Sequence, residues 1–414
     1  MLLILCGSCR QQPEAPRIWL TNPGNFTHKD APVVIKRDEL RKSLGMLPAH
    51  KFLLLKDSSG KVVPSQMDDL DQDGQWDEVA FLYSFAAGQK LWLNYSWVDS
   101  ADVPAFEKRS HVYLGKWDSL AQKYVPIRSE QRPADHHRQF SAPFLYQMEG
   151  PAWENDKVAF REYFDERNDK DIYGKRRPEM QLEQIGAPGG PSYHDLQPWG
   201  MDILNVSNSL GAGSLALYYK DSLYALGQTD SARVDLLVDG PLRSVLRLRY
   251  AGWQVAGQSY DLQEDITIWA GIYGYMSEVS LKGPLDSVDI VTGVADLVGR
   301  PVTLGEDYGN FQSWGDYGAQ SEHHDNLGMA IIVPNAELVY KAMAPRLPME
   351  DSTRIANSLY VRLKSEPQPV RFYFYAGWAM SDDRFKDRSG FLSYLREQAQ
   401  FLNNPILVNV PVHE

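Results

Sequence analysis

Cysteine is almost absent from this chain of 414 residues: Cys6 and Cys9 are its two cysteines, and both precede residue 10. Paired cysteines that would bind zinc are therefore missing, and so is a framework of disulfide bonds. The sequence also lacks the glycine-rich loop that cradles phosphate groups and the turn that presents a catalytic serine. These absences disfavour zinc-binding domains, nucleotide-dependent enzymes and serine hydrolases.

Positive charge is also scarce, because 42 Lys and Arg face 54 Asp and Glu and the formal net charge is −12. This balance disfavours nonspecific binding to nucleic acid and to anionic membrane surfaces. An anionic substrate would need a local basic patch. The stretch 160–202 supplies one, with Arg161, Arg167, Lys170, Lys175, Arg176 and Arg177.

The first sixteen residues resemble the end of a bacterial lipoprotein signal peptide followed by a tether. A short apolar run ends in Gly7, Ser8 and Cys9, and a polar segment containing Pro13 and Pro16 follows. The run is too short to span a bilayer, and the positively charged start of a signal peptide is missing. We expect a lipid on Cys9 to anchor a periplasmic protein to the outer membrane. The alternative is an ordinary buried N-terminus.

Hydrophobic periodicity predicts one strand after another in the second half of the chain. The clearest are 214–220, 233–238, 244–250, 260–269, 274–282 and 288–294. A helix with Ser389 as its N-cap is predicted to close the chain. Long successive strands joined by Gly and Asp turns predict an all-β protein, a large antiparallel β-sandwich with minor helices. We divide it into a tether (1–16), an N-terminal β region with an Asp-rich loop (17–105) and the main sandwich carrying the site (106–414).

The Asp-rich loop carries carboxylates at alternate positions and a glycine where a calcium loop turns sharply. Its candidate ligands are Asp69, Asp71, Asp73 and Asp77. The twelfth position is Ala80 instead of the glutamate of a helical calcium hand, and a strand is predicted to follow. The loop is therefore either a structural calcium site between two strands or an acidic turn whose Asp side chains cap their own backbone. No other cofactor is expected.

The stretch from Phe160 to Asp202 is the candidate site. After Phe164 it follows neither strand nor helix periodicity, and six glycines and prolines between 186 and 198 predict a loop. A long loop dense in Arg, Lys, Tyr, His and Asp within a compact protein is typical of a functional segment. We expect it to form the catalytic centre.

Elimination from a uronic acid suits these residue types. It needs cations to neutralise the sugar carboxylate, a base for the proton alpha to it, and an acid for the leaving oxygen. The candidate carboxylate ligands are Arg161, Arg167 and Lys175. His194 is the candidate base, with Tyr193 or Tyr163 as acid, or as base if an arginine lowers its pKa. The alternative for His194 is a hydrogen-bonded loop histidine, and Arg161 and Asp165 are equally consistent with a plain ion pair.

Two further groups of residues are candidates for contact with a sugar. Aromatic residues interleaved with glycine near Trp314 and Tyr317 favour a flat stacking platform, or else an aromatic turn that packs on the sheet. Trp199 and Asp202 are assigned to substrate binding as well. The cluster 135–138, which contains His136, His137 and Arg138, is predicted to be a solvated loop, with substrate contact as the alternative.

Several motifs together resemble a known family. They are 159–168 (AFREYFDERN), 171–175 (DIYGK), Tyr193-His194, 199–202 (WGMD) and 210–213 (LGAG). The chain resembles the domain-of-unknown-function 4861 family of lipoproteins from polysaccharide-utilisation gene clusters, and the resemblance covers nearly all of it. It implies a β-sandwich like those of polysaccharide lyases and mutarotases. It also implies similarity to a dehydratase that forms 4,5-unsaturated uronyl ends on ulvan oligosaccharides.

The sequence thus predicts a carbon–oxygen lyase that eliminates water, or an alcohol, from the terminal uronic acid of an anionic oligosaccharide. A glycoside hydrolase is the first alternative, using a carboxylate pair drawn from Glu162, Asp165, Asp171 and Asp202. A non-catalytic glycan-binding lipoprotein is the second. The expected partner is the oligosaccharide, with contact to the membrane only through the lipid on Cys9.

Overall fold

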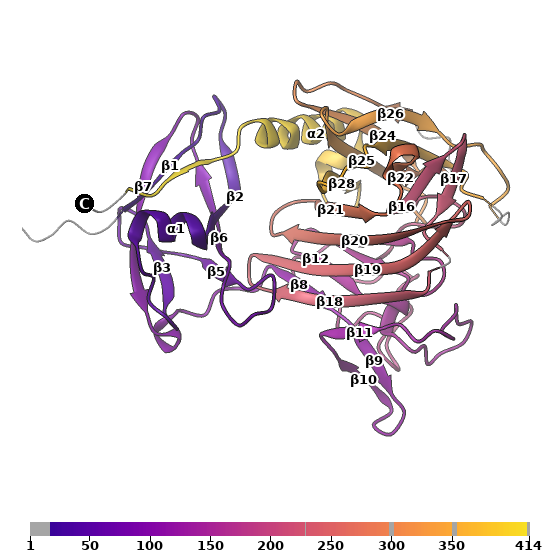
Figure 1. Cartoon of the computed structure of the whole chain (residues 1–414), viewed down its shortest axis with the longest axis horizontal. Helices are drawn as coiled ribbons and strands as arrows, with labels where there is room; N and C mark the ends of the chain where they lie inside the picture. The colour runs from indigo at the N-terminus through magenta and orange to yellow at the C-terminus, as the bar shows by residue number, and fades with distance from the viewer. Residues whose placement is uncertain (1–16, 228, 298–301, 350–353, 412–414) are drawn as a thin grey trace, which may run out of the picture. The chain divides into compact units, whose positions relative to one another are not determined.

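The computed structural model describes residues 17–227, 229–297, 302–349 and 354–411 (Figure 1). The predicted lipid attachment at Cys9 and the tether lie outside these residues. Within the described part of the chain, no helix has both the length and the apolar character needed to cross a membrane.

The chain forms two compact units. The described residues of the first are 17–67, 77–105 and 406–411, and those of the second are 68–76, 106–227, 229–297, 302–349 and 354–405. Two segments therefore differ from the ranges 17–105 and 106–414 expected from sequence. The loop 68–76 joins the second unit because Leu70 packs against Leu237 and its neighbours. The C-terminal segment joins the first because its strand pairs with the chain's first strand.

The first unit holds a five-stranded sheet, a three-stranded sheet and a short helix. The first sheet is ordered β29 (Leu407–Asn409), β1 (Arg17–Thr21), β7 (Lys90–Val98), β3 (Phe52–Lys56) and β4 (Val62–Val63). The second is ordered β2 (His28–Lys36), β6 (Glu78–Phe85) and β5 (Ser65–Asp68). Helix α1 (Arg37–Leu44) follows β2 directly, and a 3-10 turn, η1 (Ser100–Asp102), follows β7. Alternating burial along β1 and β2 shows the two-residue period of half-buried strands.

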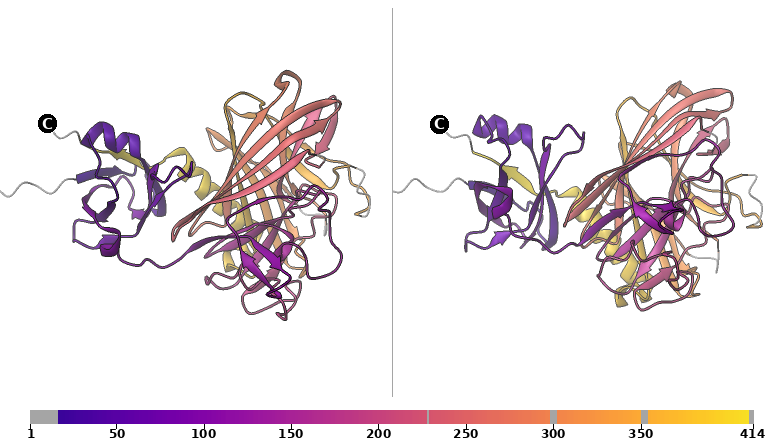
Figure 2. Two further views of the ribbon diagram at one scale, coloured as in Figure 1. Left: turned by 60° about the horizontal axis from the view of Figure 1, so that its bottom comes forward. Right: turned by 90° about the horizontal axis from the view of Figure 1, so that it is seen from below.

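The second unit contains three large antiparallel sheets (Figure 2). The nine-stranded sheet is ordered β11 (Ser129–Gln131), β18 (Ser231–Asp239), β19 (Arg243–Val255), β20 (Gln258–Trp269), β21 (Gly274–Lys282), β28 (Val370–Trp378), β25 (Asn326–Pro334), β24 (Phe311–Ala319) and β23 (Val302–Leu304). One five-stranded sheet is ordered β15 (Gly200–Asp202), β14 (Lys170–Lys175), β13 (Val158–Glu162), β12 (Ala152–Asn155) and β8 (Ser110–Tyr113). The other is ordered β17 (Ser222–Ala225), β16 (Ala212–Tyr219), β22 (Asp289–Ala295), β27 (Ser358–Leu363) and β26 (Leu338–Met343).

Smaller elements complete this unit. They are the hairpin of β9 (Gly115–Asp118) and β10 (Lys123–Pro126), the 3-10 turns η2 (Gln147–Glu149), η3 (Leu285–Ser287) and η4 (Asp383–Lys386), and helix α2 (Arg388–Asn403). Helix α2 is the predicted helix near the end of the chain, and it ends at Asn403. Its N-cap is Asp387 rather than the expected Ser389, because the Asp387 carboxylate accepts a hydrogen bond from the Gly390 amide.

One apolar core joins these sheets into a sandwich. Buried side chains from the nine-stranded sheet, such as Leu246, Ile266 and Phe374, belong to the same cluster as Phe160 and Ile172 of the β15–β8 sheet. Strand β19 alternates as predicted: Leu246 and Leu248 enter this core, while Arg247 pairs with Asp265 on the neighbouring strand. The prediction of an all-β antiparallel sandwich with few helices is confirmed.

Strands β13 and β14 present different chemistry on their two faces. Their register sets Arg161 beside Asp171 and Glu162 beside Lys170. Because side chains alternate along a strand, Glu162 and Lys170 share the core face with Phe160 and Ile172, and Arg161 and Asp171 take the other face. Strand β14 is thus regular structure in a region that the sequence predicts to be loop.

The core face holds a buried ionic cluster. Lys170 Nζ lies 2.9 Å from Glu264 Oε2 and 3.6 Å from Glu162 Oε2, and all three side chains are about 1% exposed. Tyr250 donates a hydrogen bond to Glu162, and Ser277 Oγ donates to Glu264 Oε1 at 2.6 Å. Burial raises the pKa of Glu162 to about 7. The cluster therefore ties β13 and β14 to the nine-stranded sheet through charges that cannot reach water.

Replacement of Lys170 by Met should destabilise the second unit by about 3–5 kcal/mol, because it leaves two buried carboxyl groups without their cation. Equilibrium unfolding in urea, followed by tryptophan fluorescence, measures the loss. The exposed Lys364→Met is the matched control and should change stability by less than about 0.5 kcal/mol. The triple variant Lys170→Met, Glu162→Gln, Glu264→Gln should recover most of the loss. A Lys170→Met protein as stable as the control would contradict this account.

Candidate functional site

A cavity of about 630 Å³ opens beside the turn that joins β13 and β14. It is lined by Arg138, Tyr163, Arg167, Asp169, His194, Asp202, Leu204, Asn205, Val206, Ser207, Glu322 and Met349. Tyr163, Arg167 and Asp169 come from that turn, and Asp202 ends β15. The expected site residues Tyr163, Arg167, His194 and Asp202 are therefore brought together. All of these residues belong to the second unit.

Arg161 lies beneath the cavity and is fully buried. Its Nη2 donates to Tyr163 Oη at 2.6 Å, to Asp171 Oδ2 at 2.7 Å and to Asp202 Oδ2 at 2.9 Å. Its Nη1 lies 3.3 Å from Tyr193 Oη, and its Nε also bonds Asp171. The expectation that Arg161 binds a substrate carboxylate is wrong, because the protein's own carboxylates and phenols occupy its donors. Arg161 instead holds the site residues together.

Asp202 and His194 meet at the cavity wall. His194 Nδ1 lies 3.6 Å from Asp202 Oδ2, and the histidine side chain is 66% exposed. Partial desolvation and the nearby Arg161 guanidinium lower the pKa of His194 below its ordinary value. Burial and the adjacent Asp171 carboxylate raise the pKa of Asp202 well above its usual range. His194 is thus a neutral imidazole near pH 7 and can accept a proton.

The two tyrosines of the site keep their protons and do not act as bases. Tyr163 Oη donates to Asp171 Oδ2 at 2.8 Å, and burial raises the pKa of Tyr163 well above its usual range. Burial also raises the pKa of Tyr193, whose ring packs against His194 with centroids 4.4 Å apart. Arg161 opposes this rise in both phenols but does not overcome the effect of burial, so the expectation that an arginine makes either phenol a base is wrong.

Arg167 lies at the cavity surface. Its guanidinium packs 3.8 Å from the Tyr163 ring centroid and bonds Asp165 and, at 2.7 Å, Glu149 Oε1. Its side chain is 19% exposed, so one edge can still reach a ligand. Arg167 therefore remains a candidate substrate ligand.

Three ionisable residues of the cavity lining, Arg138, Asp169 and Glu322, were not among the site residues assigned from sequence. Asp169 follows Asn168, whose left-handed backbone (φ 47°) turns the chain back into β14. Its carboxyl group has no hydrogen-bond partner among the described residues, and burial raises the pKa of Asp169 to about 8, against the opposing effect of Arg167. Glu322 also lines the cavity, as does Arg138, for which a solvated loop was expected and substrate contact was the alternative. The feature of the sequence that could have identified Asp169 as a site residue is its position between Arg167 and Lys170, within the candidate stretch 160–202.

The remaining predicted site residues lie outside the cavity lining. Lys175 is buried, with Nζ 2.5 Å from Glu154 Oε2, so it cannot bind a substrate carboxylate. Tyr317 is buried against helix α2 and donates to the Phe385 carbonyl, which rules out a stacking platform there. Trp314 packs on the core and donates to the Ala342 carbonyl at 3.0 Å. Trp199 packs edge-to-face on the buried Tyr173.

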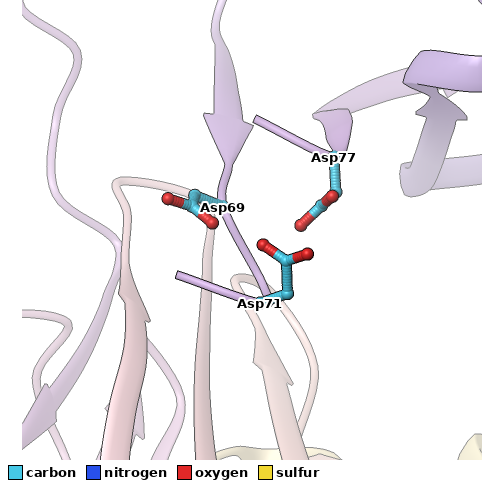
Figure 3. Close-up of side chains that lie close together, drawn as sticks. All are labelled: Asp69, Asp71 and Asp77. Carbon is cyan, nitrogen blue, oxygen red and sulfur yellow. The ribbon is translucent and has the colours of Figure 1, made fainter. Parts of the chain in front are cut away.

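The Asp-rich loop lies between strands β5 and β6, as expected. Asp69, Asp71 and Asp77 each bring one carboxylate oxygen within 4.8 Å of the others (Figure 3). Asp73 is not part of this group and instead accepts a hydrogen bond from the Gln75 amide. Asp69 Oδ1 is a buried oxygen without a hydrogen-bond partner in the structure, which suits a hard cation such as calcium.

Calcium should raise the melting temperature of the protein relative to an EDTA-treated sample, because it would bind the folded loop in preference to the unfolded chain. The double variant Asp69→Asn, Asp71→Asn should lose this response, and Asp38→Asn, Asp102→Asn should retain it. Isothermal titration calorimetry then measures the binding directly. Equal melting temperatures in calcium and EDTA would leave the loop as an acidic turn.

Asp169 should make the second unit less stable as pH rises. The carboxyl group titrates near 4 when unfolded and near 8 when folded, so the folded state binds more protons between these values. The free energy of unfolding therefore falls between pH 4 and pH 8. Asp169→Asn should remove this slope, so its melting temperature relative to wild type should rise from pH 5 to pH 9. Thermal melts across that range test it, with the exposed Asp383→Asn as control. A pH-independent difference would contradict the prediction.

The chain is similar to a protein known from its sequence and to two solved structures. The uncharacterized protein P7 of Formosa agariphila is 22% identical over 380 residues, which cover 84% of this chain and 82% of that protein. An alpha-mannosidase from Enterococcus faecalis V583 aligns with a TM-score of 0.48, 9% identity, and coverage of 98% of this chain and 47% of its own. A glycosyl hydrolase family 38 protein from Enterococcus faecalis gives a TM-score of 0.49, 9% identity, and coverage of 97% and 48%.

This chain spans about half the length of these two solved structures. At 9% identity the similarity does not extend to their activity. The family comparison covers the chain almost completely. A model described as "Domain of unknown function (DUF4861)" matches residues 20–408. The chain therefore belongs to this family, as its motifs predict.

Proposed function

We propose that the cavity of the second unit eliminates water, or an alcohol, from the terminal uronic acid of an anionic oligosaccharide and leaves a 4,5-unsaturated uronyl end. One observation carries the proposal: a neutral imidazole (His194), a carboxyl group that keeps its proton near pH 7 (Asp169) and two guanidinium groups (Arg138 and Arg167) line the same cavity. Elimination beside a carboxylate needs these three functions at once.

The first step is removal of the proton on C5, alpha to the sugar carboxylate. His194 is the base in this proposal, because the lowered pKa leaves its imidazole unprotonated. Negative charge then builds on the carboxylate, which Arg138 and Arg167 stabilise. Arg138 suits this role because its guanidinium has no carboxylate partner among the described residues; its ring contact there is Phe140, 5.2 Å away.

The second step breaks the bond between C4 and its oxygen. The electron pair of the former C5–H bond forms the C4–C5 double bond, and the leaving oxygen takes the proton of Asp169 to depart as water. Asp169 suits this role because it is protonated at neutral pH and its carboxyl group makes no hydrogen bond within the described protein. Proton exchange with solvent returns His194 and Asp169 to their starting states.

The protonation states disfavour the hydrolase alternative built on Asp202. A glycoside hydrolase needs one carboxylic acid and one ionised carboxylate across the bond that it cleaves. Asp169 and Asp202 both line the cavity, and the pKa of each is raised. A hydrolase would therefore need Glu322, the third carboxyl group of the cavity lining, as one of its two catalytic residues. The substitution Glu322→Gln thus distinguishes the two mechanisms.

Wild-type protein should raise the absorbance at 235 nm of uronate-ended oligosaccharides, with a loss of about one water mass by mass spectrometry. His194→Ala and Asp169→Asn should each lower kcat/KM by about 100-fold or more. Arg138→Ala should lower kcat/KM by about 10-fold, with part of the loss in kcat, because its guanidinium stabilises charge that builds up as the proton is removed. The exposed His50→Ala, Asp383→Asn and Arg388→Ala are matched controls.

Activity should fall as pH rises through about 8, where Asp169 loses its proton, and again at low pH, where His194 gains one.

Two results would contradict the proposal. Release of reducing sugar without a change at 235 nm, abolished by Glu322→Gln, would establish the hydrolase. Glycan binding without any product would establish a binding protein. Full activity in His194→Ala or Asp169→Asn would overturn the residue assignment even if elimination were observed.

A further inference from the structure

A second cavity of about 320 Å³ lies in the same unit. It is lined by Arg132, Pro133, Ala134, His136, His137, Glu166, Gly227, Thr229, Asp230, Ser231 and Ala232. None of these residues takes part in the elimination proposed above. The cavity therefore needs its own explanation.

The two cavities share a wall. His137 lines the second cavity, and the next residue, Arg138, lines the first. In the same way, Glu166 lines the second cavity and Arg167 lines the first. Successive residues are 3.8 Å apart along the backbone, so the two spaces lie on either side of the same two segments. Glu166 Oε2 joins these segments: it accepts a hydrogen bond from the Arg138 amide at 2.9 Å and lies 3.5 Å from His137 Nδ1.

The charges of the second cavity do not suit an anion. Arg132 donates to the Asp165 carbonyl, to Asn168 Oδ1 at 2.7 Å and to Thr229 Oγ1 at 3.3 Å, so the protein itself occupies its guanidinium. Burial lowers the pKa of His136. The carboxylates of Glu166 and Asp230 oppose binding of sulfate or a second uronate. The other polar side chains of the lining, such as His137, Thr229 and Ser231, can form hydrogen bonds with the hydroxyl groups of a ligand.

An exposed aromatic ring lies on the same loop. Phe140 is 85% exposed, although large apolar side chains are usually buried. Its ring centroid is 5.2 Å from the guanidinium carbon of Arg138, which lines the first cavity. A flat ring at this place can pack against the apolar face of a sugar.

We propose that the second cavity is a binding subsite for an uncharged sugar, the one joined through C1 of the uronic acid held in the first cavity. The proposal rests on the proposed function and adds to it where the second sugar of the oligosaccharide binds and that this sugar is uncharged. The loop 132–140 then contacts both residues, with Arg138 on the uronate and His136 and His137 on its neighbour.

Binding affinity tests the subsite separately from the chemistry. The probes are methyl β-D-glucuronide, a disaccharide of glucuronic acid β-linked to glucose as an uncharged sugar, and the same disaccharide carrying a sulfate on the glucose. Isothermal titration calorimetry is performed on the full chain with Asp169→Asn, because this substitution is expected to slow turnover by about 100-fold or more and so to keep the probes intact during the titration. The unsulfated disaccharide should bind at least about 10-fold more tightly than the methyl glucuronide, and the sulfated one no more tightly than the unsulfated one.

A substitution that fills the cavity supplies the structural control. Ala134→Trp, added to Asp169→Asn, should abolish the gain from the second sugar and leave the affinity for methyl glucuronide within about twofold. Ala121→Trp, at the exposed tip of the β9–β10 hairpin, should change neither affinity. Near-ultraviolet circular dichroism and a melting curve verify that both variants are folded.

The outcomes separate the two proposals. A gain of affinity that Ala134→Trp abolishes, without any rise at 235 nm in the wild type, would support the subsite and contradict the elimination. Elimination with equal affinities for the glucuronide and the disaccharide would overturn the subsite alone. Tighter binding of the sulfated probe would overturn the assignment to an uncharged sugar, and absence of binding by all three probes would overturn both proposals.

Discussion

The candidate site depends on one buried cation. Arg161 lies at the centre of the outer face of the β15–β8 sheet and joins Asp171, Asp202 and Tyr163 with one guanidinium group. Arginine suits this position because its planar group has five fixed donors and keeps its charge when buried. Without this cation, two carboxyl groups of neighbouring strands would approach each other away from water. The geometry of Asp202, and with it the position of His194, follows from Arg161.

The same strand pair carries a second buried charge on its other face. Lys170 lies between Glu162 and Glu264 in the sandwich core, one residue from Asp171 and directly after Asp169. An ionic cluster in the core contributes little net stability compared with apolar packing, but it tolerates few alternative arrangements. We infer that the two clusters fix the ends of the 163–169 turn, so that Asp169 has a defined position in the cavity although its carboxyl group makes no hydrogen bond there.

The architecture could be predicted from sequence because it depends on period-two alternation, which Leu246, Leu248 and their neighbours display without ambiguity. The site was predicted only in part. Tyr163, His194 and Asp202 could be identified from their residue types. Residue type does not show, however, which side chains pair within the protein: Lys175 was predicted to bind substrate, but it forms a buried ion pair with Glu154. Tyr317 was predicted to belong to a sugar-stacking platform, but its side chain is part of the hydrophobic core because helix α2 covers it. Arg138 reaches the cavity from a loop 25 residues before Tyr163, a proximity that no local pattern encodes.

The protonation states of the site result from this placement. A carboxyl group near Arg167 would ordinarily be ionised, yet desolvation outweighs the arginine and raises the pKa of Asp169 to about 8. The imidazole of His194 is kept neutral by partial desolvation and by Arg161. In the proposed elimination, Asp169 and His194 are therefore in the forms that the reaction needs at the same pH, and Arg161 contributes to this from a buried position outside the cavity lining. Such opposed shifts within one cavity are a feature of catalytic sites, and they reduce stability because each neutral form replaces a better solvated ion.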